Sequence, residues 1–159
     1  EHRPLSGATI AFIGDGNNVA HSLMIAGSAV GATVRVAAPV GYAPQQHFVD
    51  VAAGLDGVIE LYTDPYEAVK GADVVYTDVW TSMGSESEAA ERREKFVPFR
   101  VNEALLDAAN DDAIFMHCLP AHRGEEVTDG VMDHARSRVY DQSENRLHSF
   151  KAILHTLAG

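Results

Sequence analysis

Short apolar runs alternate with longer segments of helical periodicity along the whole chain. The runs are rich in β-branched residues, as in strands that are buried on both faces of a parallel sheet. Strands alternating with helices predict an α/β fold, a doubly wound parallel five-stranded sheet with helices on both faces (Rossmann-like). The predicted strands are residues 8–13, 33–38, 58–61, 74–77 and 113–116.

The segments between these runs carry apolar residues at helical spacing. No linker, repeat or low-complexity stretch interrupts them, so residues 1–159 are predicted to form one domain. Residues 86–95 are charged on nearly every side, which predicts an exposed helix or a mobile loop. The other predicted helices are residues 19–30, 45–53, 65–69, 101–109 and 131–136, followed by a final amphipathic helix at 145–157.

The order of the strands decides where a ligand would bind. For five strands with right-handed crossovers, the common doubly wound order places the first strand beside the fourth. Ligands in such sheets bind outside the carboxyl ends of the strands, where the winding reverses. The loops after residues 13 and 77 are therefore expected to flank the site.

The charge balance argues against several classes of partner. Twelve basic residues against twenty-three acidic ones give a formal charge of −11, which disfavours nucleic acid and an anionic membrane surface. No apolar stretch approaches the roughly 18 residues of a spanning helix. The single cysteine, Cys118, agrees with a reducing compartment, the cytoplasm. The chain starts at Glu1, close to the first strand, as expected of a fragment cut at a domain boundary.

The loop after the first strand, residues 14–18, reads Gly-Asp-Gly-Asn-Asn. A dinucleotide fingerprint needs Gly or Ala where Val19 stands and an acid near the end of the second strand, before Pro39. Both are missing, so no nucleotide cofactor is expected. A glycine turn before a helix offers free amides to an anion. Asn17 or Asn18 either caps that helix or orients the anion, and the pair beside the glycines favours the second role.

The loop after the fourth strand, residues 78–84, reads Asp-Val-Trp-Thr-Ser-Met-Gly. The Asp78 carboxylate can hold an ammonium group, while the Ser82 hydroxyl and loop amides can hold a carboxylate. This combination suits a small zwitterion such as an amino acid. The structural alternatives are that loop amides satisfy Asp78 and that Trp80 packs over the sheet edge, which is the favoured role for Trp80.

The sequence His117-Cys118-Leu119-Pro120 follows the fifth strand directly. A lone cysteine is more often an inert core residue than a nucleophile, but Cys118 falls on the same predicted edge as the two loops. Neighbours on an extended segment point to opposite faces, so a nucleophilic Cys–His pair is not predicted. Proline turns the backbone and can leave carbonyl groups free to accept from an NH2 group.

The sequence Glu144-Asn145-Arg146 opens the final predicted helix. Arg146 is either a surface arginine, the commoner case, or a clamp for an oxyanion or a carbonyl oxygen. No metal site is expected, because the eight histidines show neither His-x-His nor His-Glu-x-x-His spacing.

The four motifs, in this order and spacing, closely resemble the carboxyl-terminal, ornithine-binding domain of the ornithine carbamoyltransferase family. The resemblance runs from about Leu5 to the end of the chain, and residues 78–84 are its most discriminating element. It implies transfer of the carbamoyl group of carbamoyl phosphate to the δ-amine of L-ornithine, which gives L-citrulline and phosphate. It also implies that the full-length protein is a homotrimer.

The resemblance implies a role for each residue that would hold the amino-acid end of ornithine. Asn18, with Asn17, would bind the α-carboxylate. Asp78 would hold the α-ammonium, and Ser82 with Met83 would complete the pocket.

The resemblance also implies which residues lie near the reaction. Cys118 and Leu119 would lie beside the δ-amine and the carbamoyl group, and Arg146 would contact carbamoyl phosphate. The amine must lose a proton before it attacks, and Asp78 and Cys118 are the candidates for tuning that loss.

Two departures from the family pattern limit these implications. Residues 41–57 look shorter than usual, which puts the second helix in doubt. The family's phosphate-binding Ser-x-Arg-Thr-Arg motif, which lies in the amino-terminal domain, is absent from the chain. Most contacts to carbamoyl phosphate would then be missing, so the chain alone is expected to be inactive.

Other functions remain open at this stage. A carbamoyltransferase for another amine is one, although an aspartate enzyme would be expected to carry His-Pro-Leu-Pro in place of the sequence at 117–120, and enzymes for putrescine or N-acetylornithine would be expected to alter residues 82–84. A non-catalytic amino-acid-binding module of the same fold is another. The direction of flux, anabolic or catabolic, cannot be read from these motifs.

Overall fold

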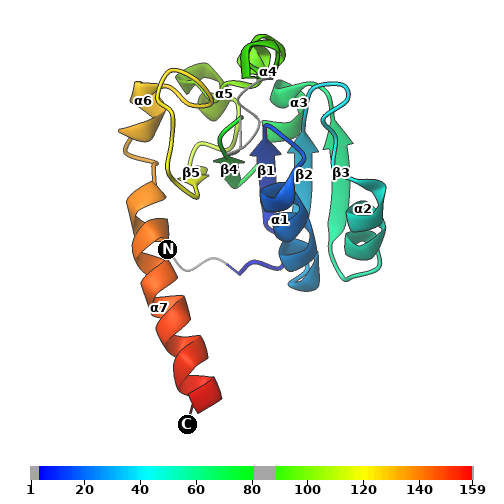
Figure 1. Ribbon diagram of the computed structural model, residues 1–159, viewed down its shortest axis with the longest axis vertical. Helices are drawn as coiled ribbons and strands as arrows, with labels where there is room; N and C mark the ends of the chain where they lie inside the picture. The colour runs from blue at the N-terminus through cyan, green and yellow to red at the C-terminus, as the bar shows by residue number, and fades with distance from the viewer. Residues whose placement is uncertain (1–3, 81–88, 159) are drawn as a thin grey trace.

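A parallel sheet forms the centre of the structure, a computed structural model that describes residues 4–80 and 89–158. Its five strands lie in the order β3-β2-β1-β4-β5 (Figure 1). The predicted doubly wound fold is confirmed, and so is the adjacency of the first and fourth strands. The strands are β1 (Thr9–Ile13), β2 (Thr33–Ala37), β3 (Val58–Tyr62), β4 (Val74–Thr77) and β5 (Ile114–His117).

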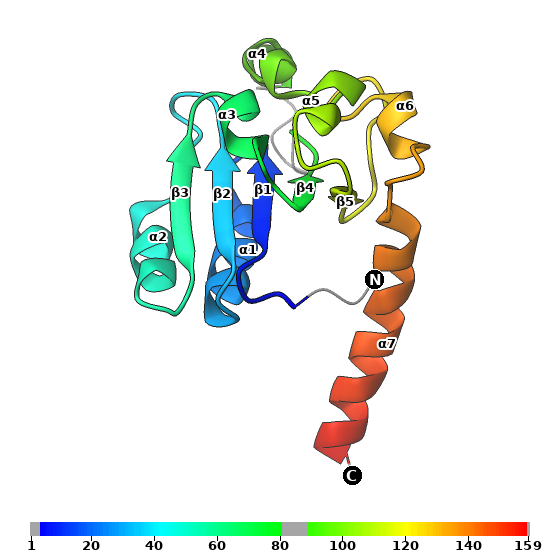
Figure 2. The ribbon, with the colours of Figure 1, turned by 180° about the vertical axis from the view of Figure 1, so that it is seen from behind.

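Helices cover both faces of the sheet (Figures 1 and 2). α1 (Asn18–Ala29) and α2 (Gln46–Ala53) pack on one face, and α3 (Pro65–Val69) and α5 (Glu103–Asp107) pack on the other. The second helix is therefore present despite the short segment at 41–57. The remaining helices are α4 (Ala89–Phe96), the 3-10 helix η2 (Val97–Phe99), α6 (Asp129–Met132) and α7 (Val139–Ala158).

Alternate residues of β1 supply the two halves of the core. Ala11 and Ile13 pack in the half that contains α3 and α5, whereas Phe12 packs with Met24 in the half that contains α1 and α2. All four side chains are fully buried. A strand covered on both faces has no polar side, which explains why the strands read as continuous apolar runs.

The predicted helix boundaries are wrong in three places, each for a local reason. The helix predicted at 101–109 is shorter because the Asn102 side chain accepts from Leu105 N at 2.9 Å and caps α5. The helix predicted at 131–136 is α6, which starts earlier because Thr128 caps it. The final helix begins at Val139 instead of 145, because fully buried Val139 anchors an extra turn and a half to the core.

The charged segment predicted at 86–95 is helical where the structure describes it, as α4. This helix is not exposed on every side, because Phe96 at its end is fully buried and lies 6.0 Å from the Trp80 ring. Trp80 itself is buried, so its predicted packing role is confirmed.

α7 extends away from the rest of the chain, past the β5 edge of the sheet (Figures 1 and 2). Its apolar side chains remain largely exposed, because no described residue buries the apolar side of its distal half. They are Leu147, Phe150, Ile153, Leu154 and Leu157. Within the described ranges, no helix combines the length and apolar character needed to cross a membrane.

The ends of β1 and β4 are fastened together at the carboxyl edge of the sheet. The buried Thr77 hydroxyl donates to the Ile13 carbonyl oxygen at 2.6 Å. The loop that follows β1 is held from the other side, where Gly16 N donates to the Tyr42 carbonyl oxygen at 2.9 Å. The loops after β1 and β4 therefore lie side by side, as the topology predicts.

Gly16 allows this close approach, and we expect Gly16→Ala to lower the free energy of unfolding by about 1–3 kcal/mol, the usual cost of overpacking. An added Cβ would lie 2.3 Å from Pro44 N and 2.5 Å from the Ala43 carbonyl carbon. The control is Gly54→Ala, where an added Cβ would lie 3.5 Å from the Val51 carbonyl oxygen and a change within about 0.5 kcal/mol is expected. Equal losses for both variants in urea denaturation would contradict this packing.

Candidate functional site

The candidate site centres on a contact between the loops after β4 and β5. The Cys118 thiol donates to Asp78 Oδ1 at 3.0 Å, and Val79 N donates to the same oxygen at 2.8 Å. Both side chains are half-buried. Two of the residues singled out in the sequence, 40 positions apart, are thus brought together at the carboxyl edge of the sheet.

The Cys118 thiol remains protonated at neutral pH in this environment. Burial raises its pKa, the hydrogen bond and negative charge of Asp78 raise it further, and the result is about 12. A hydrogen bond from Tyr76 acts in the opposite direction. Because the thiolate is the reactive form of cysteine, Cys118 serves here as a hydrogen-bond donor and not as a nucleophile.

The buried His117 side chain fixes the turn that follows Cys118. Leu119 N donates to His117 Nδ1 at 2.8 Å, which makes that nitrogen an acceptor and leaves the ring proton on Nε2. His117 Nε2 lies 3.3 Å from Glu126 Oε1, which also accepts from His122 N at 2.5 Å. His117 and Glu126 are fully buried.

The turn itself has an unusual backbone. Leu119 adopts a left-handed conformation with φ 57°, and the Leu119–Pro120 peptide bond is cis. Both ring nitrogens of His117 are occupied, so the imidazole has no free nitrogen for a metal ion, although its ligand atom lies within 4.8 Å of those of Asp78 and Cys118.

Asn17 and Asn18 differ in their surroundings. The Asn17 side chain accepts from Val19 N at 3.2 Å and caps α1, which is the structural role weighed in the sequence. Asn18 lies exposed in the first turn of α1, and its side chain has no hydrogen-bond partner in the part of the chain that the structure describes. Asn18 is therefore the asparagine available to a ligand.

Arg92 is a residue that the sequence did not single out, and it cross-links the site. Its guanidinium pairs with Asp15, donates through Nε to the Trp80 carbonyl oxygen at 2.9 Å, and lies 4.8 Å from the centre of the Tyr42 ring. Burial raises the pKa of Asp15, and Arg92 opposes that shift. Its ion pair with Asp15 and its contact with Tyr42 arise from tertiary structure, so in the sequence Arg92 looks like the other charges of α4.

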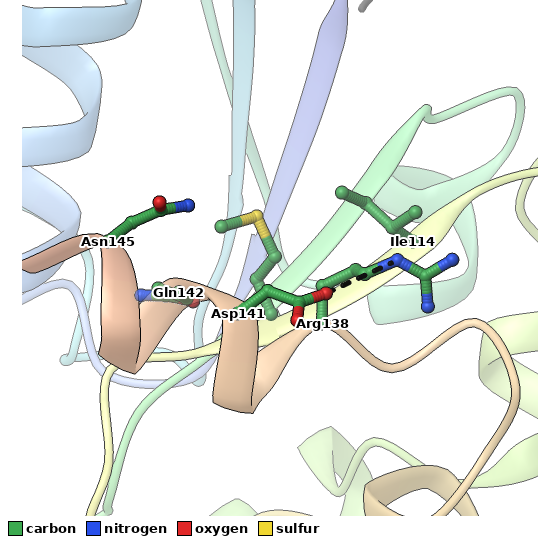
Figure 3. A pocket seen from close by; sticks show the side chains of 6 residues that line it. Ile114, Arg138, Asp141, Gln142 and Asn145 are labelled. Atoms are coloured by element: carbon green, nitrogen blue, oxygen red, sulfur yellow. Dashed lines mark ion pairs between the residues drawn. The ribbon is translucent and has the colours of Figure 1, made fainter. Parts of the chain in front are cut away.

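Arg146 lies apart from the Asp78–Cys118 pair. It is exposed on the third turn of α7, not at a helix start, and lines a cavity of about 320 Å³ with Gln142 and Phe150. A second cavity of about 530 Å³ lies between α7 and β5, and Figure 3 shows the Arg138–Asp141 ion pair in its lining. The residues that line the two cavities include neither Asp78 nor Cys118. Ser82 and Met83 lie outside the described residues.

We expect Glu126→Ala to lower the free energy of unfolding by roughly 2–5 kcal/mol, because it leaves His117 Nε2 and His122 N without an acceptor in the interior. The control is Glu125→Ala, whose partly exposed carboxylate pairs with Arg93 and should contribute less than about 1 kcal/mol. Chemical denaturation measures both. A loss for Glu126→Ala no larger than the control would show that the pair does not fix the turn.

We expect Asp78→Asn to speed alkylation of Cys118 by iodoacetamide at pH 8 by about tenfold or more. Removing the carboxylate lowers the thiol pKa, and each unit of pKa changes the thiolate fraction tenfold. Asp64→Asn is the control, because Asp64 caps α3 away from the thiol. Peptide mass spectrometry follows Cys118. An unchanged or slower rate in Asp78→Asn would rule out the contact.

Comparison with known proteins gives this geometry a family. Residues 6–157 match the model described as "Aspartate/ornithine carbamoyltransferase, Asp/Orn binding domain". Among curated relatives, the ornithine carbamoyltransferase of Thermococcus kodakarensis is 57% identical over 98% of this chain and 50% of its own length. The anabolic ornithine carbamoyltransferase of Pyrococcus furiosus is 56% identical over the same shares. The chain thus spans about half the length of the curated relatives that it matches.

Solved structures agree with these matches. The ornithine carbamoyltransferase of Pyrococcus furiosus superposes with a TM-score of 0.89 at 57% identity, covering 94% of this chain and 49% of that one. The anabolic enzyme of Campylobacter jejuni gives a TM-score of 0.90 at 35% identity, covering 98% and 53%. The chain therefore belongs to the aspartate/ornithine carbamoyltransferase family and matches its Asp/Orn binding domain.

Proposed function

We propose that this chain is the ornithine-binding half of an ornithine carbamoyltransferase, which transfers a carbamoyl group from carbamoyl phosphate to the δ-amine of L-ornithine. The observation that carries the proposal is the Asp78–Cys118 contact of 3.0 Å at the carboxyl edge of the sheet. The names of the relatives support ornithine as the acceptor. Two of those names include the word anabolic, which supports a place in arginine biosynthesis.

The carboxylate of Asp78 suits the α-ammonium of ornithine. Cys118 and Val79 both donate to Oδ1, and no partner of Oδ2 occurs among the described residues. An ammonium group at Oδ2 would form a charge-assisted hydrogen bond in a partly water-excluded setting, where such bonds are strongest.

The opposite charge of ornithine suits the start of α1. Asn18 offers a side-chain amide there, and the first-turn amides of a helix favour a carboxylate. The Asn17 amide orients this turn by capping it. Ser82 and Met83 complete the proposed pocket by resemblance.

The proposed reaction needs a neutral δ-amine. Its nitrogen forms a bond to the carbamoyl carbon, the bond from that carbon to the phosphate oxygen breaks, and the amine loses a proton. The Cys118 thiol, protonated at neutral pH, would donate a hydrogen bond and orient the amine instead of accepting this proton. The backbone carbonyl groups of Leu119 and Pro120 would accept from the carbamoyl NH2. Arg146 would contact carbamoyl phosphate.

The donor's phosphoryl oxygens require cations that this chain does not supply in a Ser-x-Arg-Thr-Arg motif. We propose that the other half of the full-length protein supplies them, and that the 159-residue chain alone makes no citrulline. We also propose that the full-length protein is a cytoplasmic homotrimer. The single cysteine supports a reducing compartment, and light scattering of the full-length protein tests the trimer.

In the full-length protein, we expect Asp78→Asn to lower kcat/KM for ornithine roughly 30- to 900-fold. Loss of one partner of a hydrogen-bonded charge pair costs about 2–4 kcal/mol, and each 1.36 kcal/mol is a factor of ten. The loss should appear mainly as a higher KM for ornithine, with a smaller change in the KM for carbamoyl phosphate. Asp64→Asn, far from the site, should be unchanged.

The assay also separates the alternatives. Citrulline formation by the wild-type protein supports the proposal, whereas turnover of putrescine or aspartate in preference to ornithine would assign another amine. Ornithine binding without turnover of any amine would indicate a non-catalytic module. An Asp78→Asn protein with the wild-type KM for ornithine would remove Asp78 from the ammonium site.

A further inference from the structure

A row of polar side chains runs from α7 through the core to the site. Gln142 Nε2 donates to the Tyr76 hydroxyl oxygen at 2.7 Å. Tyr76 and Cys118 pack together in the same half of the core, and the Tyr76 hydroxyl lowers the pKa of the Cys118 thiol, as a donor to its sulfur does. Cys118 then donates to Asp78 Oδ1 at 3.0 Å. Three elements, α7, β4 and the β5 loop, are thus joined through side chains.

The hydrogen-bond donors in this row of side chains all point in one direction, from α7 toward Asp78. Because the Tyr76 oxygen accepts from Gln142, its own proton is free to go to the Cys118 sulfur. The Cys118 proton then goes to Asp78. Each donor in such a row polarises the next, so the row is stronger than its separate bonds. Tyr76 is only 6% exposed, which keeps water from replacing either of its partners.

We propose that Tyr76 and Gln142 are positioning residues that hold the Cys118 thiol as a hydrogen-bond donor to Asp78. The thiol occupies one carboxylate oxygen and so directs the other toward a ligand. The identity of that ligand, the ornithine ammonium, rests on the proposed function. Arg146 lies one helical turn beyond Gln142 on α7. The row of side chains from Gln142 to Asp78 therefore links the helix of Arg146 to the site.

Three other titratable groups lie around the Cys118 thiol. Asp78 and Tyr76 approach it from β4, and His117 precedes it on β5. The imidazole of His117 is engaged on both nitrogens, by Leu119 N and by Glu126. Among these groups, only the Tyr76 hydroxyl is placed to donate to the sulfur.

Alkylation of Cys118 by iodoacetamide between pH 8 and 9.5 tests the proposal without any ligand. Tyr76→Phe removes the donor that stabilises the thiolate, so we expect the rate to fall about three- to tenfold, equivalent to about 0.5–1 unit of pKa. The plot of alkylation rate against pH should stay parallel to that of the wild type. A role in packing alone predicts the opposite, because a loosened core exposes the thiol and speeds alkylation.

Gln142→Glu tests the direction in which the side chains donate their hydrogen bonds. A carboxylate at this position accepts the Tyr76 proton and draws it away from the sulfur, so alkylation should slow as it does in Tyr76→Phe. The matched control is Tyr62→Phe, which removes a hydroxyl that donates to Glu60 at 3.1 Å on β3 and should leave the rate unchanged.

An unchanged or faster rate in Tyr76→Phe would overturn the proposal, and so would a faster rate in Gln142→Glu. Peptide mass spectrometry identifies Cys118 in each sample. Ornithine is absent from the assay, so its result is independent of whether the protein binds ornithine.

Discussion

The site depends on the pairing of β1 with β4. These neighbours lead to crossovers on opposite faces of the sheet, and ligands of doubly wound folds bind at the point between two such strands. The buried Thr77–Ile13 hydrogen bond fixes the two strand ends in register. Everything that we assign to ligand binding follows from this edge, because it brings the β1, β4 and β5 loops within reach of one another.

Two carboxylates at this edge, Asp15 and Asp78, are stabilised in different ways. Asp78 lies close enough to Asp15 for its charge to raise the pKa of Asp15. Among the described residues, Arg92 forms its ion pair with Asp15. Asp78 instead receives neutral donors, the Cys118 thiol and the Val79 amide. A carboxylate held by neutral donors keeps its charge available, which is the physical reason that a cationic ligand suits it.

The sequence predicted the strands to within about one residue because buried parallel strands are apolar on both faces. It also predicted the edge on which Asp78 and Cys118 meet, because crossover rules constrain the strand order. It did not predict Arg92, Gln142 or Glu126. Their contacts with Asp15, Tyr76 and His117, respectively, span 9 to 77 residues, and no periodicity encodes a side-chain hydrogen bond over such a separation.

Two further outcomes have local causes. Asn17 resembles a ligand residue, but its side chain is used to cap α1, and the sequence pattern is the same for both roles. The start of α7 was missed because its first turns are polar after Val139 and Tyr140, and the burial of Val139 is tertiary. Apolar periodicity becomes visible only in the exposed distal half of the helix.

The most direct test of the central claim is a crystal structure of the full-length protein with ornithine bound. We predict that the α-ammonium lies within hydrogen-bond distance of the Asp78 carboxylate, that the α-carboxylate lies at Asn18, and that the δ-nitrogen lies beside Cys118. Ornithine bound away from the β1–β4 edge, or bound there with its δ-nitrogen at Asp78 and its α-ammonium at Cys118, would contradict the account.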